Sequence, residues 1–164
     1  MLKRLLAKAS PLLGSHGDWQ GSCLLCHQPC DHEPLLCSWC RQALHQSQPR
    51  CHLCAAPLAD YIEESILVCG RCQRRPPPWE RLQVIGDYRA PYPMLIPRLK
   101  YSGQILLAPL LARLLADHLD GSEPPEAIIP VPLHWWRQWR RGFNQAEEIA
   151  QALGEFTGIL CDNT

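Results

Sequence analysis

Residues 23–54 read CLLCHQPCDHEPLLCSWCRQALHQSQPRCHLC, and the tetrapeptide CGRC follows at residues 69–72. Four CxxC pairs therefore lie in one short part of the chain. A CxxC turn places two thiolates within reach of one ion, and two such turns complete the tetrahedral S4 site of a structural zinc. We expect two zinc sites in sequence. Their ligands are Cys23, Cys26, Cys37 and Cys40 in the first site and Cys51, Cys54, Cys69 and Cys72 in the second.

The spacing of the cysteines leaves other assignments open. Interleaved pairing, or a single occupied site, would use the same eight thiols. Five further side chains lie among the ligands and could replace one of them: His27, Cys30, His32, His45 and His52. A thioredoxin-like redox pair is less favoured, because it requires one CxxC at the start of a helix in a βαβ unit. Cys161 is distant and is expected to be a small buried apolar residue.

Charge and composition exclude several classes of protein. The 164 residues carry 16 basic and 16 acidic side chains, which excludes a uniformly basic nucleic-acid coat and an acidic disordered tail. The N-terminal sequence MLKRLLAKASPLLG is a poor signal peptide, and no stretch approaches the roughly 20 apolar residues of a membrane span. We therefore expect a cytoplasmic protein whose thiols stay reduced and whose CxxC pairs bind metal.

Metal is also needed to explain how the cysteine-rich region folds. Apolar residues between positions 15 and 75 are scattered and follow neither a helical nor a strand period. Such a segment buries too little surface to offset its chain entropy. A structural zinc site contributes on the order of 10 kcal/mol, so metal binding and folding are expected to be coupled.

The second half of the chain follows a different pattern. RRPPPW at residues 74–79 predicts a stiff boundary, because consecutive prolines favour polyproline II. We expect an N-terminal segment at 1–19, a double zinc ribbon at 20–75 and an α/β domain at 76–164. The expected elements are a strand at 81–88, helices at 94–101 and 105–118, a buried parallel strand at 127–132, a helix at 145–153 with Asn144 as its N-cap, and a strand from 159.

Residues 133–145 form the expected ligand site of this domain. They carry three arginines, three tryptophans and no acid, between a strand and the start of a helix, where open α/β sheets bind ligands. A helix N-terminus and bidentate arginines suit phosphate. The predicted binding residues are Arg137, Arg140, Arg141, Gly142, Phe143, Asn144 and Gln145. Two alternatives are an exposed loop whose tryptophans pack on the zinc ribbon, and a surface for single-stranded nucleic acid.

Three motifs together resemble the ComF family of amidophosphoribosyltransferase-like proteins, which includes the GntX group. They are the paired CxxC motifs, LKYSG at residues 99–103, and IPVPL at residues 129–133 followed by Arg137, Arg140 and RGFNQ at residues 141–145. The last is the most specific, and CGRCQRRPPPW at residues 69–79 looks like the GntX type. The resemblance covers roughly residues 20–164.

This resemblance implies a double zinc ribbon followed by a type I phosphoribosyltransferase-like parallel sheet, with a role in natural competence and DNA uptake or utilisation. It also implies that residues 133–145 lie near the pyrophosphate of phosphoribosyl pyrophosphate. The family's acidic, Thr/Gly-rich ribose-phosphate loop has no counterpart before Thr164, so we expect a partial sheet and a truncated chain. We therefore predict no catalytic residue, leave enzymatic activity open, and expect Mg²⁺ only in a complete domain.

Two rival functions remain. One is a non-catalytic zinc-ribbon adaptor that binds single-stranded DNA, a DNA-uptake protein or another partner, and it predicts DNA binding that falls steeply with salt. The other is a redox chaperone, which predicts reversible disulfides in the CxxC pairs.

Overall fold

The computed structural model describes residues 21–30, 36–45, 48–59, 67–119 and 124–162. The chain divides into two compact units, Met1–Ala43 and Leu44–Thr164. This division differs from the domain boundary that we predicted after residue 75, since the second cysteine group shares a unit with the helices that follow it. The predicted N-terminal segment at 1–19 lies outside the described residues.

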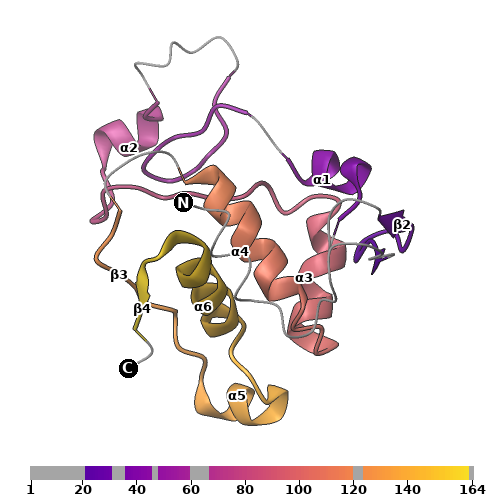
Figure 1. Cartoon of the computed structure of the whole chain (residues 1–164). Helices are drawn as coiled ribbons and strands as arrows, with labels where there is room; N and C mark the ends of the chain where they lie inside the picture. The colour runs from indigo at the N-terminus through magenta and orange to yellow at the C-terminus, as the bar shows by residue number, and fades with distance from the viewer. Residues whose placement is uncertain (1–20, 31–35, 46–47, 60–66, 120–123, 163–164) are drawn as a thin grey trace. The chain divides into compact units, whose positions relative to one another are not determined.

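The first unit is built on a small hairpin. Strand β1 (Gly21–Ser22) pairs antiparallel with β2 (Pro29–Cys30), and helix α1 (Ser38–Leu44) follows (Figure 1). Two backbone hydrogen bonds close the hairpin, from Cys23 N–H to the Gln28 carbonyl at 2.8 Å and from His27 N–H to the Cys23 carbonyl at 2.9 Å. The hairpin therefore turns at the first CxxC pair.

The second unit begins with a similar turn at the third CxxC pair. An isolated antiparallel bridge joins Arg50 to Pro57, and the short helix α2 (Gly70–Arg74) follows. The next residues, 81–88, form an irregular extended segment, so our prediction of a strand there is wrong. They have no strand partner in the described structure. Instead, the Leu82 N–H donates to the His52 carbonyl at 2.8 Å, which attaches the segment to the cysteine region.

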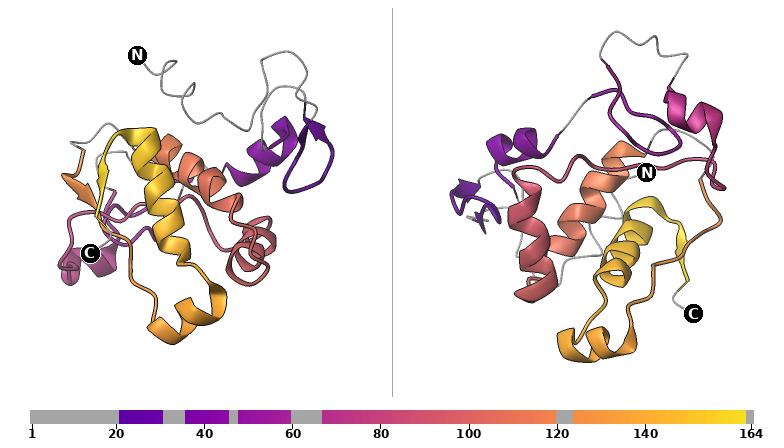
Figure 2. Two further views of the ribbon diagram at one scale, coloured as in Figure 1. Left: turned by 60° about the horizontal axis from the view of Figure 1, so that its bottom comes forward. Right: turned by 180° about the vertical axis from the view of Figure 1, so that it is seen from behind.

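Three longer helices form the rest of the second unit: α3 (Tyr92–Tyr101), α4 (Leu107–His118) and α6 (Gln145–Thr157). Helices α4 and α6 lie side by side in all views (Figures 1 and 2). Their buried contact includes Ala112, Ala152 and Leu153, with Ile128 and Phe156 packed against it. The apolar periodicity of α4 follows the prediction, because its leucines at 107, 110, 111 and 114 are all buried.

Two strands of two residues complete the unit. Strand β3 (Ala127–Ile128) pairs in parallel with β4 (Leu160–Cys161), as the predicted α/β order requires. Our prediction of a buried strand over 127–132 is wrong beyond Ile128, since Ile129 and Val131 are about three-quarters exposed. Pro130 and Pro132 lack the N–H groups that would continue the ladder.

The segment between β3 and α6 also differs from the prediction. We expected a loop at 133–145, but residues Trp135–Arg141 form helix α5, which lies beside the N-terminal start of α6 (Figure 1). The His134 side chain accepts a hydrogen bond from the Trp136 N–H at 3.3 Å, and Gly142 ends the helix with φ of 80°. Helix α6 also continues past Leu153 to Thr157, and Gly158 caps its C-terminus with φ of 77°.

Within the part of the chain that the structure describes, we find no helix with both the length and the apolar character needed to cross a membrane.

Candidate metal centres and anion site

The eight predicted ligands gather into two groups of four. In each group the four Sγ atoms lie within 4.8 Å of one another. The Sγ atoms of Cys26 and Cys37 are 3.7 Å apart, and those of Cys54 and Cys69 are also 3.7 Å apart. A tetrahedral zinc with Zn–S bonds of about 2.3 Å requires S···S edges of about 3.8 Å. The cysteines are thus grouped in the sequential order and are not interleaved, and each group could hold one metal ion of this size.

The two groups are the same local structure, present twice. At both sites the N–H of the residue after the second cysteine donates to the carbonyl of the first cysteine, at 2.9 Å for His27 and 2.7 Å for Ala55. Both residues adopt positive φ, 60° and 55°, which tightens the turn. The equivalent pairs are Cys23 and Cys51, Leu25 and Leu53, Cys26 and Cys54, Cys37 and Cys69, and Cys40 and Cys72. The same backbone hydrogen bond and the same positive φ therefore shape the CxxC turn at both sites.

The second half of each group lies at the start of a helix. Cys37 directly precedes α1 and Cys69 is the N-cap of α2, while Cys40 and Cys72 lie in the first turn. We expected each pair on its own turn, which is wrong for these two pairs. The correction has a chemical consequence at Cys69, because a backbone hydrogen bond with Cys72 in the first turn of α2 lowers the pKa of this thiol.

The cysteines of each group differ in acidity. Burial raises the pKa of Cys23 and Cys51, but surrounding backbone N–H groups outweigh it and lower the pKa of each to about 6. The donors belong to Leu25, Cys26 and Cys37 at the first site and to Leu53, Cys54 and Cys69 at the second. Burial raises the pKa of Cys72 to about 12 and also raises that of Cys40. At the second site the pKa of Cys69 is also lowered, first by its backbone hydrogen bond with Cys72, so the thiols of one group differ in how readily they ionise.

The other candidate ligands do not join either group. The described candidates His27, Cys30, His45, His52 and Cys161 lie outside both sets of four, and all ten cysteines are free thiols. His32 lies outside the described residues. Cys30 is buried, and its Sγ lies 3.7 Å from the Gln28 carbonyl oxygen. Cys161 is partly exposed on β4, so our prediction that it is buried is wrong.

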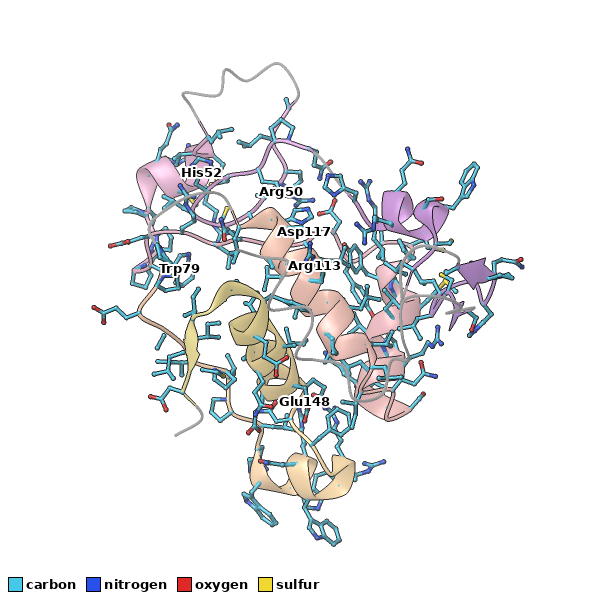
Figure 3. The ribbon with its side chains drawn as sticks, viewed as in Figure 1. Arg50, His52, Trp79, Arg113, Asp117 and Glu148 are labelled. Atoms are coloured by element: carbon cyan, nitrogen blue, oxygen red, sulfur yellow. The ribbon has the colours of Figure 1, made fainter. Side chains whose placement is uncertain are left out.

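Polar contacts join the second cysteine group to the segment between α2 and α3. The Trp79 indole Nε1 donates to the Leu53 carbonyl at 2.6 Å, across the CxxC turn. Arg50, directly before Cys51, donates from Nη1 to Asp87 Oδ1 and to the Ala55 carbonyl, both at 3.0 Å. Trp79, from the predicted boundary, and Asp87, from the segment that we predicted as a strand at 81–88, therefore brace the second cysteine group. Figure 3 shows Arg50, His52 and Trp79 around this turn.

The predicted anion site is partly assembled at the start of α6. Asn144 caps the helix, since its Oδ1 accepts from the Ala146 N–H at 3.1 Å, while its Nδ2 donates to the Val131 carbonyl at 3.3 Å. Gln145 is buried, and its Oε1 accepts from Arg141 Nη1 at 2.7 Å. Gln145 Nε2 is also buried and has no hydrogen-bond partner in the described structure. A buried donor without a partner is costly, so this atom is a candidate ligand contact.

Sequence reasoning assigned no site role to Tyr101, which meets this cluster. The Arg141 guanidinium carbon lies 5.1 Å from the centroid of the Tyr101 ring, a cation–π contact. The LKYSG motif that ends α3 and the RGFNQ motif that ends α5 therefore meet in space. The only sequence signal was the joint occurrence of both motifs.

The remaining predicted residues lie on or next to helix α5, which is exposed to solvent. None of the residues of α5 is buried, and Trp135, Trp136 and Trp139 are exposed. Within the second unit, this exposure rules against the alternative in which the tryptophans pack on the cysteine group at 51–72. Arg140 places its guanidinium carbon 5.7 Å from the Trp136 ring centroid. Arg137 is exposed on the same helix, and Phe143 links it to α6.

The chain is similar to proteins that are named for DNA utilization and for competence. The chain is 37% identical over 150 residues to DNA utilization protein YhgH of Salmonella typhimurium, a match that covers 87% of this chain and 64% of that protein. It is 38% identical over 151 residues to YhgH of Escherichia coli strain K12, with the same coverage. It is 39% identical over 130 residues to Competence protein F of Haemophilus influenzae, covering 76% of this chain and 55% of the relative.

The chain thus spans less than two thirds of the length of these relatives. No family model matches the chain. No solved structure matches it either.

Proposed function

Because the chain belongs to the ComF family, we propose that it is a zinc-binding protein of DNA utilisation with a phosphate-binding site at the start of α6. The observation that carries this proposal is the similarity to proteins named for DNA utilization and competence, over most of the chain. Both metal groups need reduced thiols, so we place this function in the cytoplasm.

We propose Zn²⁺ as the ion at both cysteine groups. Four thiolates favour soft or borderline metals, and tetrahedral S4 geometry is typical of structural zinc. The S···S separations of 3.7 Å support an ion of this size. All four positions are taken by protein sulfur, so the role of these centres is structural, and zinc stabilises the two small units around them.

At the anion site we propose that the phosphates of phosphoribosyl pyrophosphate bind to Arg141 and the amides from Gly142 to Gln145. Asn144 satisfies one N–H of the first turn of α6, and the helix end carries partial positive charge. Arg141 is held by Gln145 on one side and by Tyr101 on the other, which reduces the entropy lost when it binds. Gln145 Nε2 would supply a further donor.

We further propose that the parallel pair β3–β4 is part of a larger phosphoribosyltransferase-like sheet. Leu160, Ile129 and Val131 are all at least 70% exposed, which is unusual for the apolar residues of a parallel sheet. The relatives are longer than this chain, so further strands have a source in a longer protein. Phosphoribosyl transfer, with Mg²⁺, belongs to such a complete domain, and we assign no catalytic residue here.

Calorimetric titration of the zinc-loaded protein with phosphoribosyl pyrophosphate and with pyrophosphate tests the anion site. We expect Arg140→Ala/Arg141→Ala to weaken binding at least about tenfold, because charge-assisted hydrogen bonds are lost. Arg113→Ala is the matched control, since this exposed arginine pairs with Asp117 on α4 at 3.1 Å. Equal affinity in the double variant and the control would remove the assignment.

A second function, an adaptor for single-stranded nucleic acid, has its own support. Helix α5 exposes three tryptophans beside three arginines, which suits base stacking and contacts with the phosphate backbone. Trp135→Ala/Trp139→Ala should reduce affinity for oligo(dT) about tenfold or more, and wild-type affinity should fall steeply with salt. Trp39→Ala, exposed in the first unit, is the control. An affinity for oligo(dT) that does not change with salt concentration would exclude this function.

A further inference from the structure

Helices α4 and α6 border a pocket on the surface of the second unit, which we call the α4–α6 pocket. Its volume is about 180 Å³. A single water molecule needs about 10–15 Å³ of such space, so the pocket admits a side chain of a binding partner. Ile105 and Leu106, directly before α4, line it and are 44% and 67% exposed. Exposed apolar side chains that gather at a pocket are typical of a surface that binds a partner.

The charged residues that line the α4–α6 pocket are acidic. Glu148 and Glu155 contribute to it from α6, together with Gln151 and Ala152. These positions follow the spacing i, i+3, i+4 and i+7, so they share one face of the helix. Among the described residues, neither carboxylate has an ion-pair partner and no basic side chain lines the pocket. The expected occupant is therefore both apolar and positively charged.

Helix α5 has the complementary properties. Its tryptophans Trp135, Trp136 and Trp139 are all exposed, and the helix contains no acidic residue. Arg137 and Arg140 are exposed as well, and neither forms an ion pair in the part of the chain that the structure describes. Tryptophan and arginine are the residue types that most often dominate the binding energy of protein interfaces. The chain thus carries both a pocket and a segment that matches it in polarity and in charge.

Within one molecule α5 does not occupy this pocket, since none of its residues lines it. Arg141 instead fixes the end of α5 at the start of α6, through its hydrogen bond to Gln145 and its cation–π contact with Tyr101. Figure 3 shows Glu148 near the end of α6 that adjoins α5. The helix and the pocket are therefore neighbours on one unit, and each is left open for a second molecule.

We propose that the α4–α6 pocket binds helix α5 of a second copy of this chain. The tryptophans of α5 pack on Ile105 and Leu106, and its arginines pair with Glu148 and Glu155. Two copies exchange α5 in both directions, because a reciprocal contact closes a two-fold dimer whereas a one-way contact continues into an open chain of molecules. The inference goes beyond the proposed function, since it depends on neither the metal ions nor the phosphate site.

Sedimentation velocity of the zinc-loaded chain over a range of concentrations tests the dimer. The contact is small, so we expect dissociation constants of about 1–100 µM. The mass should rise from that of one chain to that of two and then stay constant, and added salt should weaken the dimer because it screens exposed charges. A single chain at every concentration would show that the pocket takes another occupant and overturns the proposal. A mass that continues to rise beyond two chains also contradicts it.

Two variants with reversed charge identify the contact. Glu148→Arg/Glu155→Arg reverses the pocket, and Arg137→Glu/Arg140→Glu reverses α5. Each variant alone should dimerise at least about tenfold more weakly, because like charges then face one another. An equimolar mixture of the two should dimerise again, since both contacts of the mixed dimer join opposite charges. Glu126→Arg, at an exposed position of the same unit outside the pocket, is the control and should dimerise as the wild type does.

The apolar part of the contact is tested on the pocket side. Leu106→Ala should weaken dimerisation about tenfold, because the buried part of this side chain is lost. Leu119→Ala, at the other end of α4 and outside the pocket, should not. Unchanged dimerisation in Leu106→Ala contradicts the proposed contact.

The reversed-charge variants also separate this proposal from misfolding and from the proposed functions. Far-ultraviolet circular dichroism and zinc content check that each variant is folded. A pocket variant that still dimerises, or a mixture of folded variants that stays monomeric, overturns the proposal. The pocket variant leaves α5 intact, so its binding to oligo(dT) and to phosphoribosyl pyrophosphate measures the proposed functions independently of dimerisation.

Discussion

The guanidinium carbon of Arg141 lies 5.1 Å from the centre of the Tyr101 ring, and this contact joins two motifs that are separate in the sequence. Tyr101 ends α3 and Arg141 ends α5. The same arginine donates from Nη1 to Gln145 Oε1 at 2.7 Å. Its guanidinium is therefore held between a ring and an amide, at the start of α6.

Tyr101→Ala tests whether the ring positions this arginine. An exposed cation–π contact contributes about 0.5–1 kcal/mol, so pyrophosphate affinity should fall about two- to fivefold. Tyr101→Phe retains the ring and should bind as the wild type does. The measurement is calorimetric titration, with zinc content as the check on folding. If Tyr101→Ala binds as tightly as Tyr101→Phe, the ring has no positioning role.

The metal groups predict two different outcomes for cysteine substitution. Cys72→Ala removes one of four ligands, so bound zinc measured by mass spectrometry should fall from two ions to about one. Because a structural zinc contributes on the order of 10 kcal/mol, the thermal transition of this variant should also broaden or move to lower temperature. Cys161→Ala, outside both groups, should retain two ions. Two ions bound in Cys72→Ala would contradict the assigned ligand set.

Gly154→Ala tests the close approach of α6 to β4. A Cβ at this position would lie 2.8 Å from the Ile159 carbonyl oxygen, which is backbone and cannot swing aside. We expect a loss of roughly 1–3 kcal/mol in unfolding free energy, although alanine is the better helix former. Chemical denaturation measures the change. Glu155→Ala, at the exposed neighbouring position, should be close to neutral, and a stabilised Gly154→Ala would show that the contact does not exist.

Asp87 gives a prediction for pH. Its hydrogen bond from Arg50 lowers its pKa below the ordinary value, so its contribution to stability is present above the ordinary pKa of about 4. The contribution is lost as the pH falls through the lowered folded pKa. Asp87→Asn should therefore be less stable than the wild type at pH 7, and the difference should disappear under acid conditions.

Denaturant unfolding of the wild type and of Asp87→Asn at several pH values measures this difference. Because the two proteins are compared at the same pH, any effect of pH on metal binding that they share cancels. Asp117→Asn is the control, because the exposed Arg113–Asp117 pair contributes little to stability. A difference for Asp87→Asn that stays constant from neutral to acid pH would contradict the role of the ion pair.

The metal ligands were predictable because their geometry is local. A CxxC turn brings two sulfur atoms together through contacts within a few residues. Each CxxC pair then groups with the next CxxC pair along the chain. The Asn144 cap was predictable for the same reason, since the capping oxygen reaches only two residues along the chain. The helical periodicity of α4 also needed no distant contact.

The strand at 81–88 and the loop at 133–145 were predicted wrongly because distant or competing interactions decide them. Alternating residues at 81–88 favour a strand, but the backbone of Leu82 pairs with the CxxC turn through His52. At 135–141 the composition suggested a binding loop, whereas the His134 cap and the left-handed Gly142 allow a short helix. A helix as short as α5 depends on the capping residues at its two ends, and the overall composition of a segment does not indicate whether such caps form.

For this protein, the sequence by itself determined the division of eight cysteines into two groups of four and the capped start of α6. These features depend on spacings of a few residues. Only the tertiary structure decided that Tyr101 meets Arg141 and that Asp87 braces Arg50. The physical reason is that these contacts join residues tens of positions apart, and packing of whole elements selects them.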